Sequence, residues 1–179
     1  MDPAGFDDVL AGKFGLFAVQ VLAGRRNGYT LWGGDYPGGY DRVLLAGGRI
    51  VLTSTIGALA RIAATESESC FALAGLGGHF AALAEAIPPD AVYLPPHACV
   101  FDFRRAAVTL ASADVPGFGD VLTCVDLVTD LRHQLGLPAQ ADSDPLRKLY
   151  DALWSEDPVA ARYAPQFTAA THWITTLIR

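Results

Sequence analysis

The first third of the chain alternates apolar and polar residues with the short period of β-strands. Two of its apolar segments flank Gly47-Gly48, and glycine accepts the positive φ that a tight hairpin turn requires. The pattern therefore predicts an antiparallel meander, preceded by a polar lead-in over residues 1–12. Its four strands are predicted at residues 14–22, 29–33, 41–46 and 49–54.

After residue 54 the apolar residues recur every three or four positions, which is the period of helices. Thr53, Ser54 or Thr55 has a side-chain oxygen suited to accept a backbone N–H at the start of the first helix. Gly136 is placed to end the longest helix, and Asp144 to cap the next. Helices are predicted at residues 56–64, 79–87, 117–135, 145–154 and 157–164, a helix or strand at 167–179, and short strands at 91–94 and at the start of 99–112.

This order of elements predicts an α+β fold, with an N-terminal antiparallel β-meander packed with a mainly helical C-terminal third. The chain has 179 residues and no stretch that resembles a long linker, so a single domain over residues 1–179 is expected. Its apolar runs are shorter than the roughly 20 residues of a membrane-spanning helix, and its first residues lack the parts of a signal peptide. We therefore expect a cytoplasmic protein without a membrane partner.

Charge and cysteine content narrow the function further. The 19 acidic and 13 basic residues give a net charge of −6, which argues against direct nucleic-acid binding, because that affinity comes from Lys and Arg on phosphates. Cys70, Cys99 and Cys124 are odd in number and widely spaced, so free buried thiols in a reducing cytosol are expected. The preference for Arg over Lys and for Asp over Glu favours a bacterial source.

Glycines within residues 75–78 precede a predicted helix and imitate the turn that holds a dinucleotide pyrophosphate. Such glycines let backbone N–H groups approach phosphate at a helix N-terminus. Phe80 stands where that motif needs a small residue, and the segment follows a meander instead of opening a βαβ unit. A plain helix-entry turn is the simpler interpretation. Because the sequence holds no nucleophile, acid–base or metal motif, we expect no catalysis, cofactor or bound metal.

Asp126, Asp130 and His133 fall on one stripe of the predicted helix 117–135, opposite its apolar stripe. Two carboxylates and an imidazole can bind a divalent metal, but no fourth ligand has motif spacing. The simpler interpretation is the outer face of an amphipathic helix, in contact with solvent or with a partner.

The loop over residues 34–40 combines glycines with Asp35, Tyr36 and Tyr40. Exposed tyrosines beside glycines are typical of partner-binding surfaces. The alternative is a long hairpin loop whose tyrosines fold back onto the sheet. The candidate partner-binding residues are therefore Asp35, Tyr36, Tyr40, Asp126, Asp130 and His133.

Two stretches resemble bacterial toxin-immunity proteins, including those of contact-dependent growth inhibition systems. The first, GYTLWG…DRVLLAGGRIVLTSTIGALARIA, is similar to the meander and capped helix of such proteins, and the second, DVLTCVDLVTDLRHQLG…LRKLYDALWSED, to their paired helices. The resemblance implies a cytosolic protein that binds a cognate toxin domain, such as a nuclease, and blocks its active site or substrate-binding surface. It carries over no individual residue.

An acidic protein without its own chemistry suits the basic cleft of a toxin, because opposite charges raise the association rate and help to select the partner. Two alternatives come from other classes. One is a small-ligand-binding protein or enzyme that uses the Gly75–Gly78 turn. The other is a non-catalytic adaptor subunit of a larger assembly.

Overall fold

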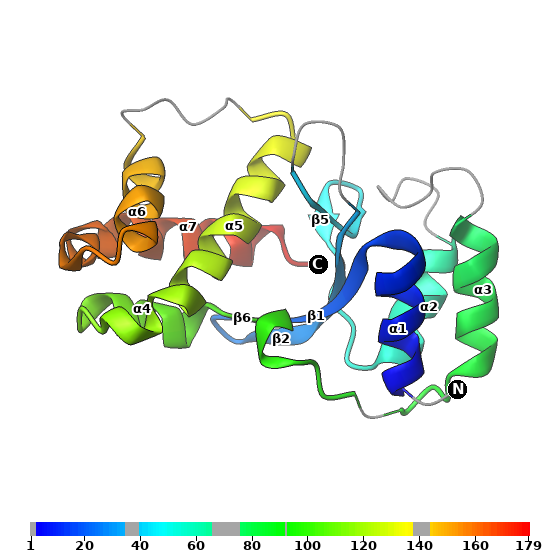
Figure 1. Ribbon diagram of the computed structural model, residues 1–179. Helices are drawn as coiled ribbons and strands as arrows, with labels where there is room; N and C mark the ends of the chain where they lie inside the picture. The colour runs from blue at the N-terminus through cyan, green and yellow to red at the C-terminus, as the bar shows by residue number, and fades with distance from the viewer. Residues whose placement is uncertain (1–2, 35–39, 66–75, 92, 138–143) are drawn as a thin grey trace. The chain divides into compact units, whose positions relative to one another are not determined.

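The computed structural model describes residues 3–34, 40–65, 76–91, 93–137 and 144–179 (Figure 1). Within these ranges the chain has an α+β fold, with strands in its N-terminal half and a mainly helical C-terminal part, as the sequence predicts. The helices are α1 Pro3–Phe14, α2 Ile56–Thr65, α3 Leu76–Ala86, α4 Phe103–Ala111, α5 Phe118–Gln134, α6 Pro145–Trp154 and α7 Ala164–Leu177, with 3₁₀ turns η1 His97–Cys99, η2 Val115–Gly117 and η3 Pro158–Tyr163.

The strands form two sheets. β1 Leu16–Ala23, β2 Arg26–Gly33, β3 Arg42–Val43 and β6 Val100–Asp102 make a sheet in the order β3-β2-β1-β6. β2 and β3 are antiparallel, with Trp32 opposite Val43. β4 Leu45–Ala46 and β5 Arg49–Ile50 make a separate antiparallel pair around Gly47-Gly48. The predicted hairpin is confirmed, but it forms its own small sheet instead of extending the meander.

Two predicted segments are wrong, and a third contains its predicted short strand, β6, followed by a helix that was not predicted. Residues 1–12 are not a polar lead-in, because Pro3–Phe14 forms a helix whose Leu10 is fully buried. The described residues among 91–94 form no strand. After the short strand β6 the chain turns helical at Phe103, since the carboxylate of Asp102 accepts hydrogen bonds from the backbone N–H groups of Arg104 and Arg105, both at 3.1 Å.

The chain divides into two compact units. One consists of Met1–Val21, Asn27–Val100 and Leu177–Arg179, and the other of Leu22–Arg26 and Phe101–Thr176. We call them the N-terminal and the C-terminal unit. The single domain over 1–179 remains a prediction from the sequence.

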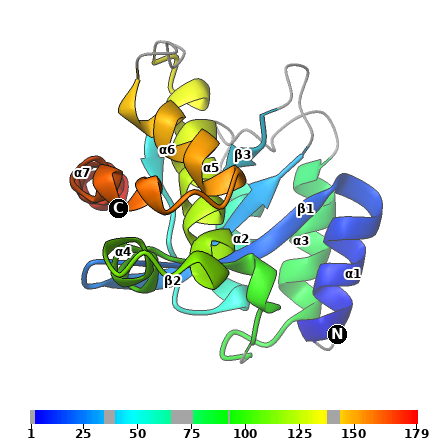
Figure 2. The ribbon, with the colours of Figure 1, turned by 60° about the vertical axis from the view of Figure 1, so that its left-hand side comes forward.

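The N-terminal unit packs α1, α2 and α3 around an apolar core, and α1 and α3 lie side by side (Figures 1 and 2). Thr55 caps α2, because its hydroxyl oxygen accepts the Ala58 N–H at 3.2 Å, which confirms a cap at residues 53–55. The Tyr29 hydroxyl donates to the Tyr93 carbonyl oxygen at 2.7 Å, and the two rings meet edge to face. The core holds Leu10, Leu16, Leu31, Leu44, Ile56, Leu59, Phe80, Leu83 and Tyr93.

The C-terminal unit is built around α5. Gly136 ends this helix with φ +66°. The N–H of Gly136 donates to the carbonyl oxygen of His133 at 3.0 Å, and the N–H of Leu137 donates to the carbonyl oxygen of Arg132 at 2.9 Å. These two bonds are the Schellman pattern, which favours glycine at this place, so the predicted helix end is confirmed. Phe103 of α4 stacks on Phe167 of α7 with ring centroids 6.0 Å apart.

We expect Gly57→Ala to destabilise the protein although alanine is the better helix former. A Cβ atom at Gly57 would lie 2.6 Å from the carbonyl oxygen of Pro88, which is backbone and cannot rotate away. Overpacking of this kind costs about 1–3 kcal/mol. At Gly78 in α3 a Cβ atom meets nothing within 4 Å, so Gly78→Ala should be neutral or stabilise by up to about 1 kcal/mol. Urea unfolding gives the free energy of unfolding of both variants. Equal changes in this free energy for Gly57→Ala and Gly78→Ala would contradict the close approach of α2 to Pro88.

Candidate functional site

The predicted acidic stripe lies on α5, but its three residues differ in exposure. His133 is exposed and Asp126 is half-buried, whereas Asp130 is only 7% exposed. The expectation of an outer face is therefore wrong for Asp130. Helix α6 packs against α5 and covers that side, which periodicity along α5 alone does not reveal.

Helix α6 begins at a cap predicted from the sequence. The carboxylate of Asp144 accepts the Leu146 N–H at 2.9 Å, and Pro145 occupies the first helical position, where its missing N–H costs nothing. Leu146, Leu149 and Leu153 are buried and hold the helix in the C-terminal unit. The opposite side of the helix remains available for contacts with other molecules.

That opposite side carries an aromatic ladder. Arg147 places its guanidinium carbon 5.9 Å from the ring centroid of Tyr150 and pairs with Asp151, Nε to Oδ1, at 3.2 Å. The Tyr150 and Trp154 rings are nearly parallel, 5° apart, with centroids separated by 6.3 Å. Trp154 is 71% exposed. The guanidinium of Arg147, the phenol of Tyr150 and the indole of Trp154 thus follow one another along the solvent side of α6. We call these three residues the aromatic ladder.

The carboxylates of α5 lie close to this ladder. The pKa of Tyr150 is raised above its ordinary value by burial and then by Asp126, with Asp151 and Asp130 adding to the effect and Arg147 opposing it. Negative charge from both helices therefore acts on the same phenol. We call the set Asp126, Arg147, Tyr150, Asp151 and Trp154 the α5–α6 face, whereas Asp130 is buried.

The composition of the α5–α6 face suits the binding of another protein. Trp, Tyr and Arg are the residues that most often carry the binding energy of protein interfaces. The carboxylates of Asp126 and Asp151, against the guanidinium of Arg147, give this set a net negative charge. Among the residues that the structure describes, no group of three His, Cys, Asp or Glu side chains is arranged to hold a metal ion.

Of the candidates proposed from the sequence, Asp126 lies on this face, Asp130 is buried, and His133 lies further along the same helix. Their role in binding a partner stays a prediction. The missed signal was the aromatic pair Tyr150 and Trp154, four residues apart on the polar side of an otherwise amphipathic helix.

The other predicted positions are not brought to the α5–α6 face by any described contact. Asp35 and Tyr36 lie outside the described residues, and Tyr40 is half-buried. Gly75 also lies outside them, and α3 begins at the next residue, Leu76. The glycine turn is therefore not tested as a ligand site.

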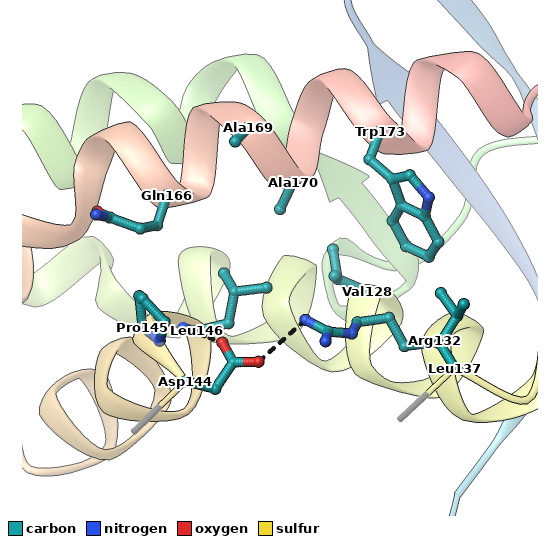
Figure 3. Close-up of a pocket in the computed structure, with 10 residues that line it drawn as sticks. All are labelled: Val128, Arg132, Leu137, Asp144, Pro145, Leu146, Gln166, Ala169, Ala170 and Trp173. Atoms are coloured by element: carbon teal, nitrogen blue, oxygen red, sulfur yellow. Dashed lines mark hydrogen bonds and ion pairs between the residues drawn. The ribbon is translucent and has the colours of Figure 1, made fainter. Parts of the chain in front are cut away.

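A second feature of the C-terminal unit is a pocket of about 380 Å³ between α7 and the α5–α6 pair (Figure 3). On one side Arg132 Nη1 lies 3.3 Å from Asp144 Oδ2. Trp173 of α7 lies on the opposite wall, toward the Arg132 end (Figure 3). The lining is mostly apolar: Val128, Arg132, Leu137, Asp144, Pro145, Leu146, Gln166, Ala169, Ala170 and Trp173.

The thiol of Cys124 is not an activated nucleophile. Cys124 is buried, and burial raises the pKa of its thiol well above the ordinary value, with Asp102, Asp120 and Asp126 adding to the rise. A neutral thiol is a poor nucleophile. Cys99 is half-buried, and Cys70 lies outside the described residues.

The pKa of Tyr150 provides a test of the α5–α6 face. Ultraviolet titration of tyrosinate, as the difference between the wild type and Tyr150→Phe, should give a midpoint above that of an ordinary tyrosine, about 10. Because the folded state favours the neutral phenol, Tyr150 loses its proton at a lower pH in the unfolded chain than in the folded chain. Its contribution to stability is therefore present below the ordinary pKa of tyrosine and is lost as the pH rises through the raised pKa of the folded state. Asp126→Asn should lower the midpoint. Asp120→Asn, elsewhere on α5, should not, and equal shifts would place Asp126 away from the phenol.

Comparisons with known proteins show the fold but no family. No family model matches the chain, and no curated protein matches it. No described helix has the length and apolar character needed to cross a membrane. In structure the chain is similar to the C-terminal domain of SatS, crystallised in complex with bromine, with a TM-score of 0.68 and 18% sequence identity over 96% of each chain. At this identity the likeness concerns the fold alone, and the chain shares the fold of that domain.

Proposed function

We propose that this chain acts by binding another protein and that the α5–α6 face makes the contact. The observation that carries the proposal is the 71% exposure of Trp154, stacked on Tyr150. A tryptophan side chain gains about 25 cal/mol for each Å² of apolar surface that leaves water. Covering this ring with a partner would gain that free energy, which the folded chain alone leaves unused.

The partner that we propose is a cognate toxin domain. This choice rests on the resemblance to immunity proteins of contact-dependent growth inhibition in the sequence. A toxin that acts on nucleic acid needs a basic cleft, and the negative charge of the α5–α6 face is complementary to it. In this proposal the chain is cytoplasmic, has no catalysis of its own, and blocks the active site or substrate-binding surface of the toxin.

Co-expression with the product of the neighbouring gene tests the proposal. We expect the two proteins to purify together and the toxin to be inactive in the complex. Trp154→Ala should weaken the complex about 30-fold, since the loss of a hot-spot side chain costs roughly 2 kcal/mol or more. Val108→Ala serves as a control, because Val108 is an exposed apolar residue on α4 of the same unit.

Three outcomes contradict this proposal at different levels. Failure to co-purify, with a toxin that still kills, excludes the immunity function. Co-purification with components of a larger assembly instead of a toxin supports the adaptor alternative. A complex that is equally sensitive to Trp154→Ala and Val108→Ala moves the interface away from the α5–α6 face.

The pocket between α7 and the α5–α6 pair favours small-ligand binding as a second candidate function. Its volume of about 380 Å³ falls in the range of pockets that bind small molecules, and its mostly apolar lining with a few polar groups is typical of them. This pocket is a different site from the Gly75–Gly78 turn, where the sequence analysis placed the small-ligand alternative.

Titration with indole, followed by NMR, tests the second candidate. We expect saturable shifts at the backbone amides of Ala169, Ala170 and Trp173. Ala169→Trp should abolish them, because Ala169 lines the pocket and is exposed, so a larger side chain there fills the pocket without disturbing the core. Thr168→Trp, one position along α7 and outside the lining, should leave them unchanged. Shifts that are absent or that survive Ala169→Trp remove this candidate.

A further inference from the structure

The aromatic ladder of α6 already contains one bound cation. The guanidinium of Arg147 lies over the face of Tyr150, 5.9 Å from its centroid, and pairs with Asp151. A cation over an aromatic ring is attracted by the negative charge of the ring face. The contact of Arg147 with Tyr150 and Asp151 thus shows, within this chain, how an aromatic ring and a carboxylate of α6 hold a guanidinium group.

The second half of the ladder presents the better ring to solvent. Trp154 lies parallel to Tyr150 and is 71% exposed, whereas Tyr150 is half-buried. Of the aromatic side chains, indole attracts cations most strongly. A cation that approaches from solvent therefore finds the strongest ring of the ladder at its open end.

One carboxylate accompanies this ring on its own helix, and further negative charge acts on the Tyr150 ring beside it. Asp151 stands three residues before Trp154, on the same side of α6, and its side chain is 58% exposed. Asp126 and Asp130 act on the neighbouring Tyr150 from α5. The surroundings thus supply negative charge and hydrogen-bond acceptors for a cation that stacks on Trp154.

We propose that the Tyr150–Trp154 stack, with Asp151, receives an arginine side chain of the partner and prefers arginine to lysine. Arginine has a planar guanidinium that stacks on an aromatic face and at the same time donates two hydrogen bonds to a carboxylate. Lysine has a compact, strongly hydrated ammonium that lacks this geometry. This inference rests on the proposed function of the α5–α6 face, and it names the group that the face recognises.

Oligo-arginine and oligo-lysine peptides of equal length, both amidated, provide the test on the full chain. Calorimetric titration at low ionic strength gives a dissociation constant for each peptide. We expect the wild type to bind oligo-arginine about two- to fivefold more tightly than oligo-lysine, which is the size of an exposed cation–π contact. Trp154→Leu, which keeps apolar bulk but no ring, should remove this preference by weakening the binding of oligo-arginine more than that of oligo-lysine.

Two matched variants separate stacking from charge. Trp154→Phe keeps a ring and should retain part of the preference for arginine. Asp151→Asn should weaken the binding of both peptides. A wild type that binds both peptides equally, or a preference that survives Trp154→Leu, overturns the inference. Because these measurements need no natural partner, their failure is distinguishable from a failure of co-purification, which concerns the proposed function.

Discussion

One carboxylate, that of Asp144, joins the end of α5 to the start of α6. One oxygen accepts the Leu146 N–H at 2.9 Å and starts α6, and the other lies 3.3 Å from the guanidinium of Arg132 near the end of α5. The cap contributes about 1 kcal/mol, and the ion pair adds up to about 1 kcal/mol because both side chains remain partly in contact with water. The direction in which α6 leaves its cap fixes where its two faces lie, so both the pocket and the α5–α6 face depend on this residue.

Features that are decided within a few residues of the chain could be predicted from the sequence. The cap of α2 at Thr55, the end of α5 at Gly136, the start of α6 at Asp144 and the hairpin at Gly47-Gly48 depend on local hydrogen bonds and on the φ angle of glycine. Features decided by distant packing could not. The apolar residues of helix α1 do not gather on one clear stripe of the helix, and the role of Leu10 becomes visible only in the folded core.

The candidate site shows the same division. Periodicity along α5 placed Asp126 and Asp130 together, but the low exposure of Asp130 follows from α6, a separate helix. Trp154 and Tyr150 were visible in the sequence as aromatic residues, and each alone is as easily part of a core. Their importance comes from the combination of exposure, parallel rings and carboxylates from a neighbouring helix, which only three-dimensional positions establish.

Helix α6 keeps its buried anchors and its exposed aromatic residues on separate sides. Leu146, Leu149 and Leu153 anchor the helix, while Tyr150 and Trp154 take no part in the buried core. Substitutions on the solvent side can therefore accumulate without loss of the fold. A few codons can thus change the exposed side of α6 while the buried side, and with it the fold, stays the same.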